Sequence, residues 1–377
     1  MKIYFIAGEI SGDYIGGSII KALKEVTNNS SQILGIGGKA MGGRGLQSLF
    51  PIKQINLMGF FEILPHIFRL RKLIENTVDD IISHEPDILV TIDSPGFTYR
   101  VAKKVRLLAP NIRLVHIVAP SVWAYKPGRA IKYANLYDRL LTLFPFEPKY
   151  FTEHGLDTSC IGHPILEQKF YDKSPELKEY FAIDPDVKAI AVTCGSRVGE
   201  INRHMPIIRP VLEELARLYN IKVIFIQPNE SNAEIISRHL LGAKFNYIFT
   251  TERLKAFAAC DYALAKSGTN ILEIAASGTP MIIGYKLNAL SFLFIKMLIR
   301  IKYACLINII ENKEIIPEFI QADFTPEKLV KALNELITDK DKASKQISKS
   351  RKILEYIGLN NNLAPSTLAA KKIIEML

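Results

Sequence analysis

The segment VKAIAVTCGSRVGEI, residues Val187–Ile201, predicts a buried strand, a tight turn and the start of a helix. The apolar run Ala189–Thr193 has the length and composition of a buried strand. Gly195 lets the chain bend where a Cβ would be strained, and Ser196 offers a hydroxyl and backbone N–H groups. Arg197 adds a planar guanidinium suited to two phosphate oxygens, next to the positive end of a helix dipole. The segment is therefore either a phosphate-binding turn or an ordinary strand-to-helix turn with a solvated arginine.

Strands and helices alternate in both halves of the chain around this segment. Two successive runs of this kind predict an α/β protein with two Rossmann-like, doubly wound parallel sheets facing across a cleft. We place the first domain at residues 1–165, completed by a last helix near 350–377, and the second at 166–349. The predicted strands besides Ala189–Thr193 are Lys2–Ala7, Asp87–Asp93, Arg113–Ala119, Leu140–Phe144, Ile221–Ile226, Asp261–Ala265 and Thr279–Tyr285.

A second turn of small residues follows the predicted strand Asp261–Ala265. Ser267, Gly268 and Thr269 lead into a helix that contains Glu273. Backbone N–H groups in such a turn could hold a phosphate, and Glu273, one helical turn further on, could reach ribose hydroxyls. The alternative for Glu273 is an acid that interacts with the helix dipole in the first turn.

Asp93 ends a buried strand and is followed by Ser94-Pro95-Gly96, which turns the chain. The C-terminal ends of strands in a parallel α/β sheet face the ligand. A carboxylate held there by a rigid turn is a candidate general base. The alternative is that Asp93 caps the following helix.

Two glycine-rich segments occupy the start of the chain. Gly8–Asp13, GEISGD, is predicted to be a loop before a helix at Ile15–Val26. Its carboxylates Glu9 and Asp13 suit sugar hydroxyls or a cation better than a pyrophosphate, while the alternative is a plain turn with Asp13 near an N-cap. Residues Ile33–Gly45, ILGIGGKAMGGRG, imitate a dinucleotide fingerprint, but their later glycines disfavour the helix that such a site needs.

Composition limits the class of partner. The net charge of +10 and the pI of about 9.2 favour anionic partners: nucleic acid, phosphorylated ligands or an anionic membrane surface. The four cysteines are far apart and form no CxxC pair, which argues against a disulfide framework and a cysteine zinc site. The chain begins without the apolar run of a signal peptide, and no stretch long enough to cross a bilayer is free of charge, so we predict no membrane span.

Apolar residues beside basic ones indicate contact with a lipid surface at two places. One is the start of a helical stripe near residue 67, and the other is the strongly apolar segment 288–306. Such combinations are typical of helices at a membrane interface, and a buried helix whose basic side chains extend to solvent is the alternative. The single tryptophan lies after a strand end and could stack on a sugar or pack as a lid. The candidate acceptor- or membrane-facing residues are Phe60, Phe61, Arg69, Trp123, Phe292, Lys296 and Arg300.

Seven short motifs occur in one order along the chain. They are GEISGD at 8–13, IDSPGF around Asp93, PSVWA at 120–124, IGHP at 161–164, GSR at 195–197, SGT at 267–269 and GY at 284–285. Together they closely resemble lipid A disaccharide synthase, a family of glycosyltransferases with the two-domain GT-B fold. The resemblance runs from about residue 2 to about residue 335. The chain departs from the family pattern at Thr193-Cys194, where a small apolar residue and a proline are usual before GSR.

The resemblance implies a reaction of lipopolysaccharide synthesis in Gram-negative bacteria. The 6-hydroxyl of 2,3-diacylglucosamine 1-phosphate attacks C1 of UDP-2,3-diacylglucosamine, the anomeric centre inverts, and a β-1,6 disaccharide and UDP form. It also implies peripheral binding at the cytoplasmic face of the inner membrane, and family members can pair through their C-terminal parts. No cofactor is expected. The Asp-x-Asp pairs at 184–186 and 339–341 are poorly placed for Mg²⁺, so no metal is expected either.

The resemblance also assigns roles to residues that match the family's motifs. Asp93 matches the proposed base, with Glu9 and Ser11 as polar groups needed for activity. Arg197, in the turn Gly195-Ser196-Arg197, matches the arginine near the UDP phosphates. The remaining nucleotide-side matches are Ser267, Gly268, Thr269, Glu273, Tyr285 and Asn308.

Three other functions remain open at this point. Another UDP-sugar transferase or epimerase would keep the nucleotide turns without needing lipid-facing patches. A regulator that binds a nucleotide sugar would tolerate loss of Asp93. A nucleic-acid binder would explain the charge, but the basic residues are dispersed and lack interleaved aromatics, so we expect no nucleic-acid partner.

Overall fold

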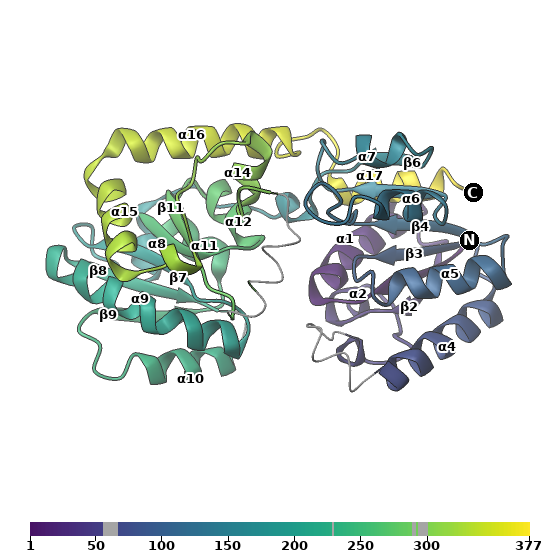
Figure 1. The fold of residues 1–377 in the computed structure, drawn as a ribbon, viewed down its shortest axis with the longest axis horizontal. Helices are drawn as coiled ribbons and strands as arrows, with labels where there is room; N and C mark the ends of the chain where they lie inside the picture. The colour runs from purple at the N-terminus through teal and green to yellow at the C-terminus, as the bar shows by residue number, and fades with distance from the viewer. Residues whose placement is uncertain (56–66, 228–229, 289–291, 293–300) are drawn as a thin grey trace. The chain divides into compact units, whose positions relative to one another are not determined.

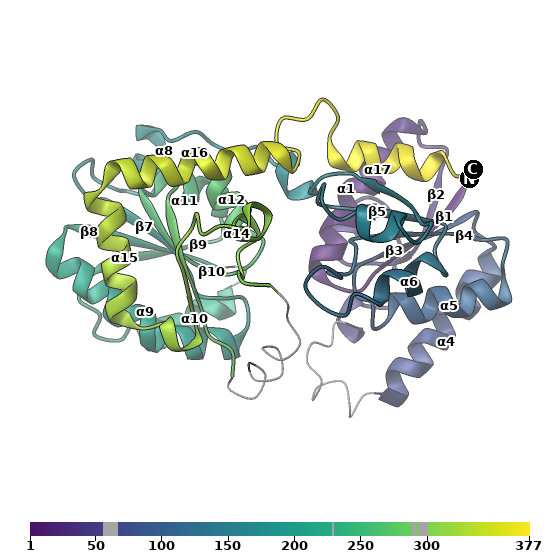
Figure 2. The same cartoon turned by 45° about the horizontal axis from the view of Figure 1, so that its top comes forward.

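A computed structural model describes residues 1–55, 67–227, 230–288, 292 and 301–377. The chain forms two compact units, which we describe separately (Figures 1 and 2). Unit 1 comprises Met1–Glu167 and Ile357–Leu377, and unit 2 comprises Gln168–Tyr356. Each unit contains one six-stranded sheet in which every pairing is parallel.

The sheet of unit 1 has the strand order β2-β1-β3-β4-β5-β6. Alternate residues of its strands face opposite sides, so Tyr4 and Ile6 of β1 pack against α4, α5 and α6. The opposite face is covered by α1 and α17, which lie side by side (Figures 1 and 2). Its elements are β1 Lys2–Ala7, α1 Ile10–Val26, β2 Gln32–Ile36, α2 Lys39–Gly42, α4 Ile67–His84, β3 Ile88–Ile92, α5 Thr98–Leu108, β4 Arg113–Ile117, α6 Arg129–Ala134, β5 Arg139–Thr142, α7 Lys149–Thr152, β6 Asp157–Cys160 and α17 Pro365–Ile374.

The sheet of unit 2 has the order β12-β11-β10-β7-β8-β9. Ile190 and Val192 of β7 pack with apolar side chains of α9 and α15 in one core, while α11 and α12 contact the strands as well. Its elements are α8 Pro175–Tyr180, β7 Lys188–Thr193, α9 Val198–Leu218, β8 Ile221–Ile226, α10 Glu230–His239, β9 Asn246–Thr250, α11 Arg253–Ala259, β10 Tyr262–Lys266, α12 Asn270–Ala276, β11 Met281–Tyr285, α14 Leu306–Glu311, β12 Glu318–Ile320, α15 Pro326–Thr338 and α16 Lys340–Tyr356.

The two parallel sheets confirm the predicted fold class. Each strand predicted from an apolar run is present, within two residues at either end. Four strands that the sequence analysis did not predict, β2, β6, β9 and β12, lie at sheet edges. The last three contain polar residues, and none of their residues is fully buried. Because only one neighbour covers an edge strand, it does not need the apolar run that marks a central strand.

The first helix corrects one expectation. α1 begins at Ile10, so most of GEISGD is helical and the predicted start at Ile15 is wrong. Glycine disfavours helices, but here it permits close packing. A Cβ at Gly16 would lie 2.8 Å from the Met41 sulfur, and one at Gly17 would lie 2.9 Å from the carbonyl carbon of Ala40.

Replacing Gly17 with Ala is therefore expected to destabilise unit 1 by about 1–3 kcal/mol, because the new methyl group meets backbone that cannot rotate away. Urea unfolding followed by the fluorescence of Trp123 measures this change. Gly42→Ala is the matched control, since nothing lies within 4 Å of its added methyl and alanine favours helices. Equal stability of the Gly17 and Gly42 variants would contradict the packing argument.

Asp13 has a structural role that its position in the sequence did not reveal. It is buried in the first turn of α1, and its carboxylate accepts hydrogen bonds from the backbone N–H groups of Gly38 (2.7 Å), Ala40 (2.9 Å) and Met41 (3.1 Å). This carboxylate occupies the donors of the glycine-rich segment 33–45. The N–H groups that a dinucleotide phosphate would need are therefore already bonded within the protein.

The chain returns to unit 1 at its C-terminal end. The Glu167 carboxylate accepts hydrogen bonds from the backbone N–H and, at 2.7 Å, from the hydroxyl of Ser366 at the start of α17. In the predicted apolar segment 288–306, α14 begins only at Leu306, and residues 289–291 and 293–300 lie outside the described residues. Among the helices that the structure describes, none combines the length and the apolar character needed to cross a membrane.

Candidate active site

Asp93 directly follows β3 and has an unusual backbone conformation. Its φ is +50°, and that of Ser94 is also +50°. Left-handed conformations are uncommon outside glycine, and two in a row concentrate strain of the kind found at functional sites. Hydrogen bonds hold the turn: the Asp93 N–H donates to the Ile117 carbonyl (3.0 Å), and the Thr98 hydroxyl donates to the Asp93 carbonyl (2.6 Å).

The turn at Asp93 packs against the end of β1. β1 and β3 are neighbours in the sheet, and a Cβ at Gly8 would lie only 2.2 Å from the Cβ and hydroxyl of Ser94. Glu9 is the next residue and the N-cap position of α1, and Ser11 is exposed in the first turn. The structure therefore brings the predicted residues Glu9, Ser11 and Asp93 to one edge of the sheet, where its parallel strands end.

Burial changes the acidity of Asp93. Desolvation raises the pKa of its carboxyl group, and the hydrogen bond that Oδ1 accepts from the Ser94 N–H (2.7 Å) partly opposes this rise. A carboxylate whose pKa lies closer to neutrality removes a proton more effectively than an ordinary surface carboxylate. Asp93 therefore has the position and the electrostatic environment of a general base.

Trp123 lies in a second cluster along the same edge. Its indole N–H donates to Oε1 of Glu147 at 3.3 Å, and its ring packs edge-on against Phe146 at 5.4 Å between centroids. Glu147 is only 3% exposed, and its other oxygen accepts the N–H groups of Leu143 and Phe144, each at 3.1 Å. Trp123 is thus held by a buried carboxylate, which sequence patterns did not indicate.

Burial raises the pKa of Glu147 to about 7, from an ordinary value of 4.5. Between these two values the unfolded chain has released a proton that the native protein retains. The contribution of Glu147 to the free energy of unfolding should therefore fall as the pH rises through this window, by up to about 1.4 kcal/mol per pH unit.

Comparison of wild type with Glu147→Gln isolates this effect. Burial lowers the pKa of His116 to about 3 and that of His163 to about 4, so these neutral histidines add stability as the pH rises toward 6.5. Both histidines are present in both proteins and cancel in the difference. We expect the difference in unfolding free energy, wild type minus variant, to decrease from pH 5 to pH 7.5. A flat difference would contradict the assignment.

In unit 2, the Gly195-Ser196-Arg197 turn joins β7 to α9 as predicted. Gly195 has φ +124°, and a Cβ there would lie 2.7 Å from the Glu200 side chain. Glu200 is 3% exposed and accepts the Ser196 N–H at 3.1 Å. The anionic group at this helix N-terminus is therefore a carboxylate of the protein itself.

The Glu200 carboxylate contacts two basic side chains and one tyrosine, which lie at or just after the ends of three strands. Nζ of Lys266, at the end of β10, lies 3.3 Å from its carboxylate, and the hydroxyl of Tyr285, at the end of β11, donates at 3.4 Å. The Arg197 guanidinium lies 3.9 Å away and is half exposed. Burial acts to raise the pKa of Glu200, but Lys266, the Ser196 N–H and Arg197 outweigh it and lower the pKa below its ordinary value. Two cations, Lys266 and Arg197, therefore lie at the Gly195-Ser196-Arg197 turn, and the more exposed Arg197 is accessible to a ligand.

The second predicted turn, Ser267–Thr269, lies beside the first. The Thr193 hydroxyl at the end of β7 accepts hydrogen bonds from the Lys266 N–H (3.0 Å) and from the Asn270 side chain (2.9 Å), so it ties the two turns together. Gly268 and Thr269 are exposed, and the Ser267 hydroxyl donates to the Ala304 carbonyl at 3.1 Å.

Two predicted nucleotide-side residues are engaged within unit 2. Glu273 is buried and accepts hydrogen bonds from Arg253 (2.7 Å) and Gln168 (3.1 Å). Asn308 is fully buried; its amide donates to the Ile316 carbonyl and to Glu318, each at 2.7 Å. Its oxygen accepts the N–H groups of residues 315 and 316, which uses all the hydrogen-bonding capacity of the side chain. Through these hydrogen bonds, Asn308 fixes the conformation of the loop before β12.

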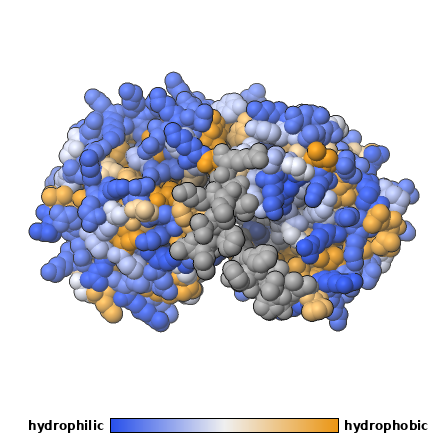
Figure 3. Space-filling model, in the orientation of Figure 1, coloured by the Kyte–Doolittle hydropathy of each residue, from blue (hydrophilic) through white to orange (hydrophobic). Residues whose placement is uncertain are grey.

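Of the predicted lipid-facing residues, Phe60, Phe61, Lys296 and Arg300 lie outside the described residues. Arg69 is exposed in the first turn of α4, next to Phe68, which is 87% exposed. Phe292 is half-buried. On the face drawn in Figure 3, hydrophilic residues dominate and apolar ones form small patches.

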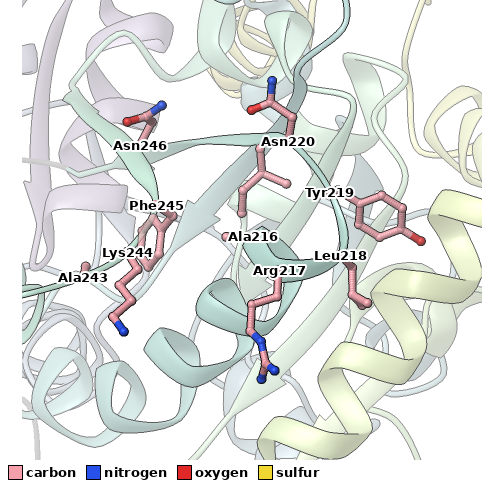
Figure 4. Close-up of a pocket in the computed structure, with 10 residues that line it drawn as sticks. Ala216, Arg217, Leu218, Tyr219, Asn220, Ala243, Lys244, Phe245 and Asn246 are labelled. Atoms are coloured by element: carbon pink, nitrogen blue, oxygen red, sulfur yellow. The ribbon is translucent and has the colours of Figure 1, made fainter.

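A hollow of ≈ 610 Å³ lies away from these residues, at the starts of β8 and β9 (Figure 4). Polar and charged side chains line it, among them Arg217, Asn220 and Lys244. Ligands of doubly wound sheets bind at the opposite edge, where strands end, so we do not assign the chemistry to this hollow. Within the part of the chain that the structure describes, no group of three or more His, Cys, Asp and Glu side chains could hold a metal ion.

Solved structures with similar folds show which architecture this chain has. Staphylococcus aureus MnaA in a UDP co-structure aligns over 99% of this chain and 94% of its own, with a TM-score of 0.65 and 12% identity. The glycotransferase of kitacinnamycin aligns over 100% and 99%, with a TM-score of 0.65 and 15% identity. These likenesses show the fold, the GT-B architecture of glycosyltransferases and related epimerases.

Sequence relatives identify the family. A family model described as lipid-A-disaccharide synthetase matches residues 3–372. The lipid-A-disaccharide synthase of Rickettsia bellii is 56% identical over 373 residues, covering 98% of this chain and 97% of the relative, and that of Rickettsia prowazekii is 52% identical with 98% of each chain covered. The chain therefore belongs to the lipid-A-disaccharide synthase family, and it is an enzyme, a hexosyltransferase. The resemblance seen in the motifs is confirmed.

Proposed function

We propose that the enzyme condenses UDP-2,3-diacylglucosamine with 2,3-diacylglucosamine 1-phosphate to form a β-1,6-linked disaccharide 1-phosphate and UDP. The environment of Asp93 is the observation that carries this proposal. A buried, strained acid with a raised pKa at a strand end suits an acceptor hydroxyl that must lose its proton. Family membership supports the choice of two acylated glucosamine substrates.

The proposed reaction is a single displacement with inversion. Asp93 removes the proton of the acceptor 6-hydroxyl as its oxygen bonds to C1 of the donor, and the bond from C1 to the UDP oxygen breaks on the opposite face. Glu9 and Ser11 orient the acceptor sugar by hydrogen bonding. Negative charge develops on the departing phosphate and is stabilised by positively charged groups and backbone N–H donors.

We assign the donor to unit 2 and the acceptor to unit 1. The assignment of the UDP phosphates to Gly195, Ser196 and Arg197 is supported by the two cations at this turn, Arg197 and Lys266. In this proposal Tyr285 packs beside the nucleotide, and Glu273 and Asn308 shape the donor site through the contacts described above. Ser267, Gly268 and Thr269 complete the donor site. The reaction is proposed to need no metal or cofactor.

The substrates also suggest where the enzyme acts. Both carry acyl chains and phosphate, so we propose peripheral binding to the anionic cytoplasmic face of the inner membrane. The net charge of +10 and the exposed neighbours Phe68 and Arg69 support this. Pairing of two chains through their C-terminal parts is a further proposal, based on the family alone.

Analysis of the product tests the proposed function. The two substrates are incubated with the enzyme in nonionic detergent, and the product is examined by mass spectrometry and by NMR of its anomeric proton. A β-1,6 disaccharide is expected. An α linkage would contradict inversion, and conversion of the UDP-sugar donor to its 2-epimer without transfer, seen by NMR, would indicate an epimerase instead.

A further inference from the structure

Arg129, the first residue of α6, is a half-buried cation that has no anionic partner among the described residues. Unit 1 has two other half-buried arginines, and both are bonded: Arg106 to Asp138 at 2.7 Å, and Arg139 to Asp157 at 2.6 Å. Among the residues that the structure describes, the Arg129 side chain makes no hydrogen bond or ion pair. A partly desolvated guanidinium favours an anion in reach, and its planar fork matches the oxygens of a phosphate.

Tyr133 lies one helical turn beyond Arg129, on the same face of α6. It is 2% exposed, and its ring packs against those of His116 (5.1 Å), Tyr137 (5.3 Å) and Tyr99 (5.4 Å between centroids). Its hydroxyl has no hydrogen-bond partner among the described residues. Buried polar atoms are rarely left in this state, so the hydroxyl indicates a missing partner.

The charges around Tyr133 connect Arg129 to the candidate base. Burial raises the pKa of the Tyr133 hydroxyl, Arg129 opposes the rise and Asp93 adds to it, so the hydroxyl is near both charges. The neighbouring His116 accepts or donates a hydrogen bond at Nδ1 with Thr91 (2.8 Å), and burial lowers its pKa to about 3, so it is neutral. Arg129 and Asp93 are therefore a cation and an acid that both act on the Tyr133 hydroxyl.

We propose that Arg129 and Tyr133 bind the phosphate of the acceptor sugar. This inference rests on the proposed function, in which the acceptor carries a phosphate monoester at C1 and reacts at its 6-hydroxyl. These groups lie at opposite ends of the sugar ring, and the Tyr133 hydroxyl feels the charges of both the cation and the acid. Arg129 supplies charge-assisted hydrogen bonds to the phosphate, and Tyr133 donates one more. The pair thereby selects a phosphorylated acceptor and sets the hydroxyl at Asp93.

Kinetics with two acceptors tests this site. Wild type and Arg129→Gln are compared using 2,3-diacylglucosamine with and without its 1-phosphate, in nonionic detergent free of phospholipid. The KM for the phosphorylated acceptor should rise about 10- to 150-fold in the variant, the effect of losing a hydrogen bond to a charged group. The KM for the donor and the use of the unphosphorylated acceptor should not change. Lys132→Gln, an exposed cation on the same helix, is the control and should act like wild type.

The variant Tyr133→Phe tests whether the Tyr133 hydroxyl binds the ligand or only stabilises the fold. Because the hydroxyl has no partner in the part of the chain that the structure describes, its removal should leave the Tm unchanged or raise it. The KM for the phosphorylated acceptor should still rise about 2- to 10-fold, as for one neutral hydrogen bond. A lowered Tm with unchanged acceptor kinetics would overturn the role of Tyr133.

Binding of glucosamine 1-phosphate, measured by NMR titration, distinguishes this inference from the proposed function. If wild type forms no disaccharide but binds this probe and Arg129→Gln does not, the proposed function fails and the phosphate site stands. If wild type forms disaccharide and Arg129→Gln has an unchanged acceptor KM, the phosphate site is wrong. Weaker binding of Arg129→Gln to vesicles of phosphatidylglycerol, with unchanged acceptor kinetics, would assign the cation to lipid headgroups and also overturn the inference.

Discussion

Asp93→Asn is expected to lower kcat by about 10²- to 10⁴-fold, the usual contribution of a general base. An amide cannot take up the proton of the acceptor hydroxyl at neutral pH. The backbone bonds of the turn, from the Asp93 N–H to Ile117 and from Thr98 to the Asp93 carbonyl, do not involve the carboxylate and should persist. The amide oxygen can still accept the Ser94 N–H, as Oδ1 does at 2.7 Å.

The substitution is also compatible with the backbone. Asparagine is among the residues that best tolerate φ near +50°, the conformation at this position. Loss of activity in Asp93→Asn should therefore occur without loss of stability, measured as an unchanged Tm. Asp79→Asn, which neutralises an exposed acid on α4, is the matched control and should retain full activity. A rate for Asp93→Asn within a few-fold of wild type would remove Asp93 from the base role.

Arg197→Gln is expected to lower kcat/KM for the donor by about 10²- to 10³-fold, since one charge-stabilising donor at a reaction centre typically contributes this much. The arginine lies at the N-terminus of a 21-residue helix, and its side chain is 56% exposed, so a phosphate can reach it. Glutamine keeps a hydrogen-bond donor but lacks the charge and the fork. The KM for the acceptor should not change, because Arg197 belongs to unit 2 and the acceptor is assigned to unit 1.

Two comparisons make the Arg197 result specific. Arg217→Gln removes an exposed charge in the last turn of the same helix and should leave donor kinetics unaltered. Arg197→Lys restores the charge without the planar fork and should recover only part of the activity. An equal loss in Arg197→Gln and Arg217→Gln would mean that overall charge, and not the turn, is responsible.

The central strands could be predicted because burial on both faces demands a continuous apolar run, as in Lys2–Ala7 and Ile221–Ile226. The start of α1 could not, because Gly12 disfavours a helix within segment 8–13, and its packing against Ile92 and Ala7 is a property of the folded protein. The same limit applies at the edges of the sheets, where β6 and β12 are stabilised by pairing and not by their composition.

In the candidate site too, residues marked by a local sequence pattern could be predicted, and residues that depend on tertiary contacts could not. Asp93 was recognisable because an acid directly follows a buried strand, and Gly195–Arg197 because small residues separate a strand from a helix. Glu147 could not be recognised, since its importance comes from Trp123, which is distant in sequence. Glu200 lies within the segment first analysed, yet only the structure shows that its carboxylate occupies the turn. Arg129 is half-buried like Arg139, but it has no partner among the residues that the structure describes, and only the folded protein reveals this difference.

Release of UDP by the wild-type enzyme tests the central claim most directly, namely that this protein joins two acylated glucosamines. UDP and disaccharide are quantified in nonionic detergent with EDTA, with both substrates present and with each omitted in turn. We predict one UDP per disaccharide, formed only when UDP-2,3-diacylglucosamine and 2,3-diacylglucosamine 1-phosphate are both present. UDP release without the acceptor, or no release while the donor still binds, would contradict the account.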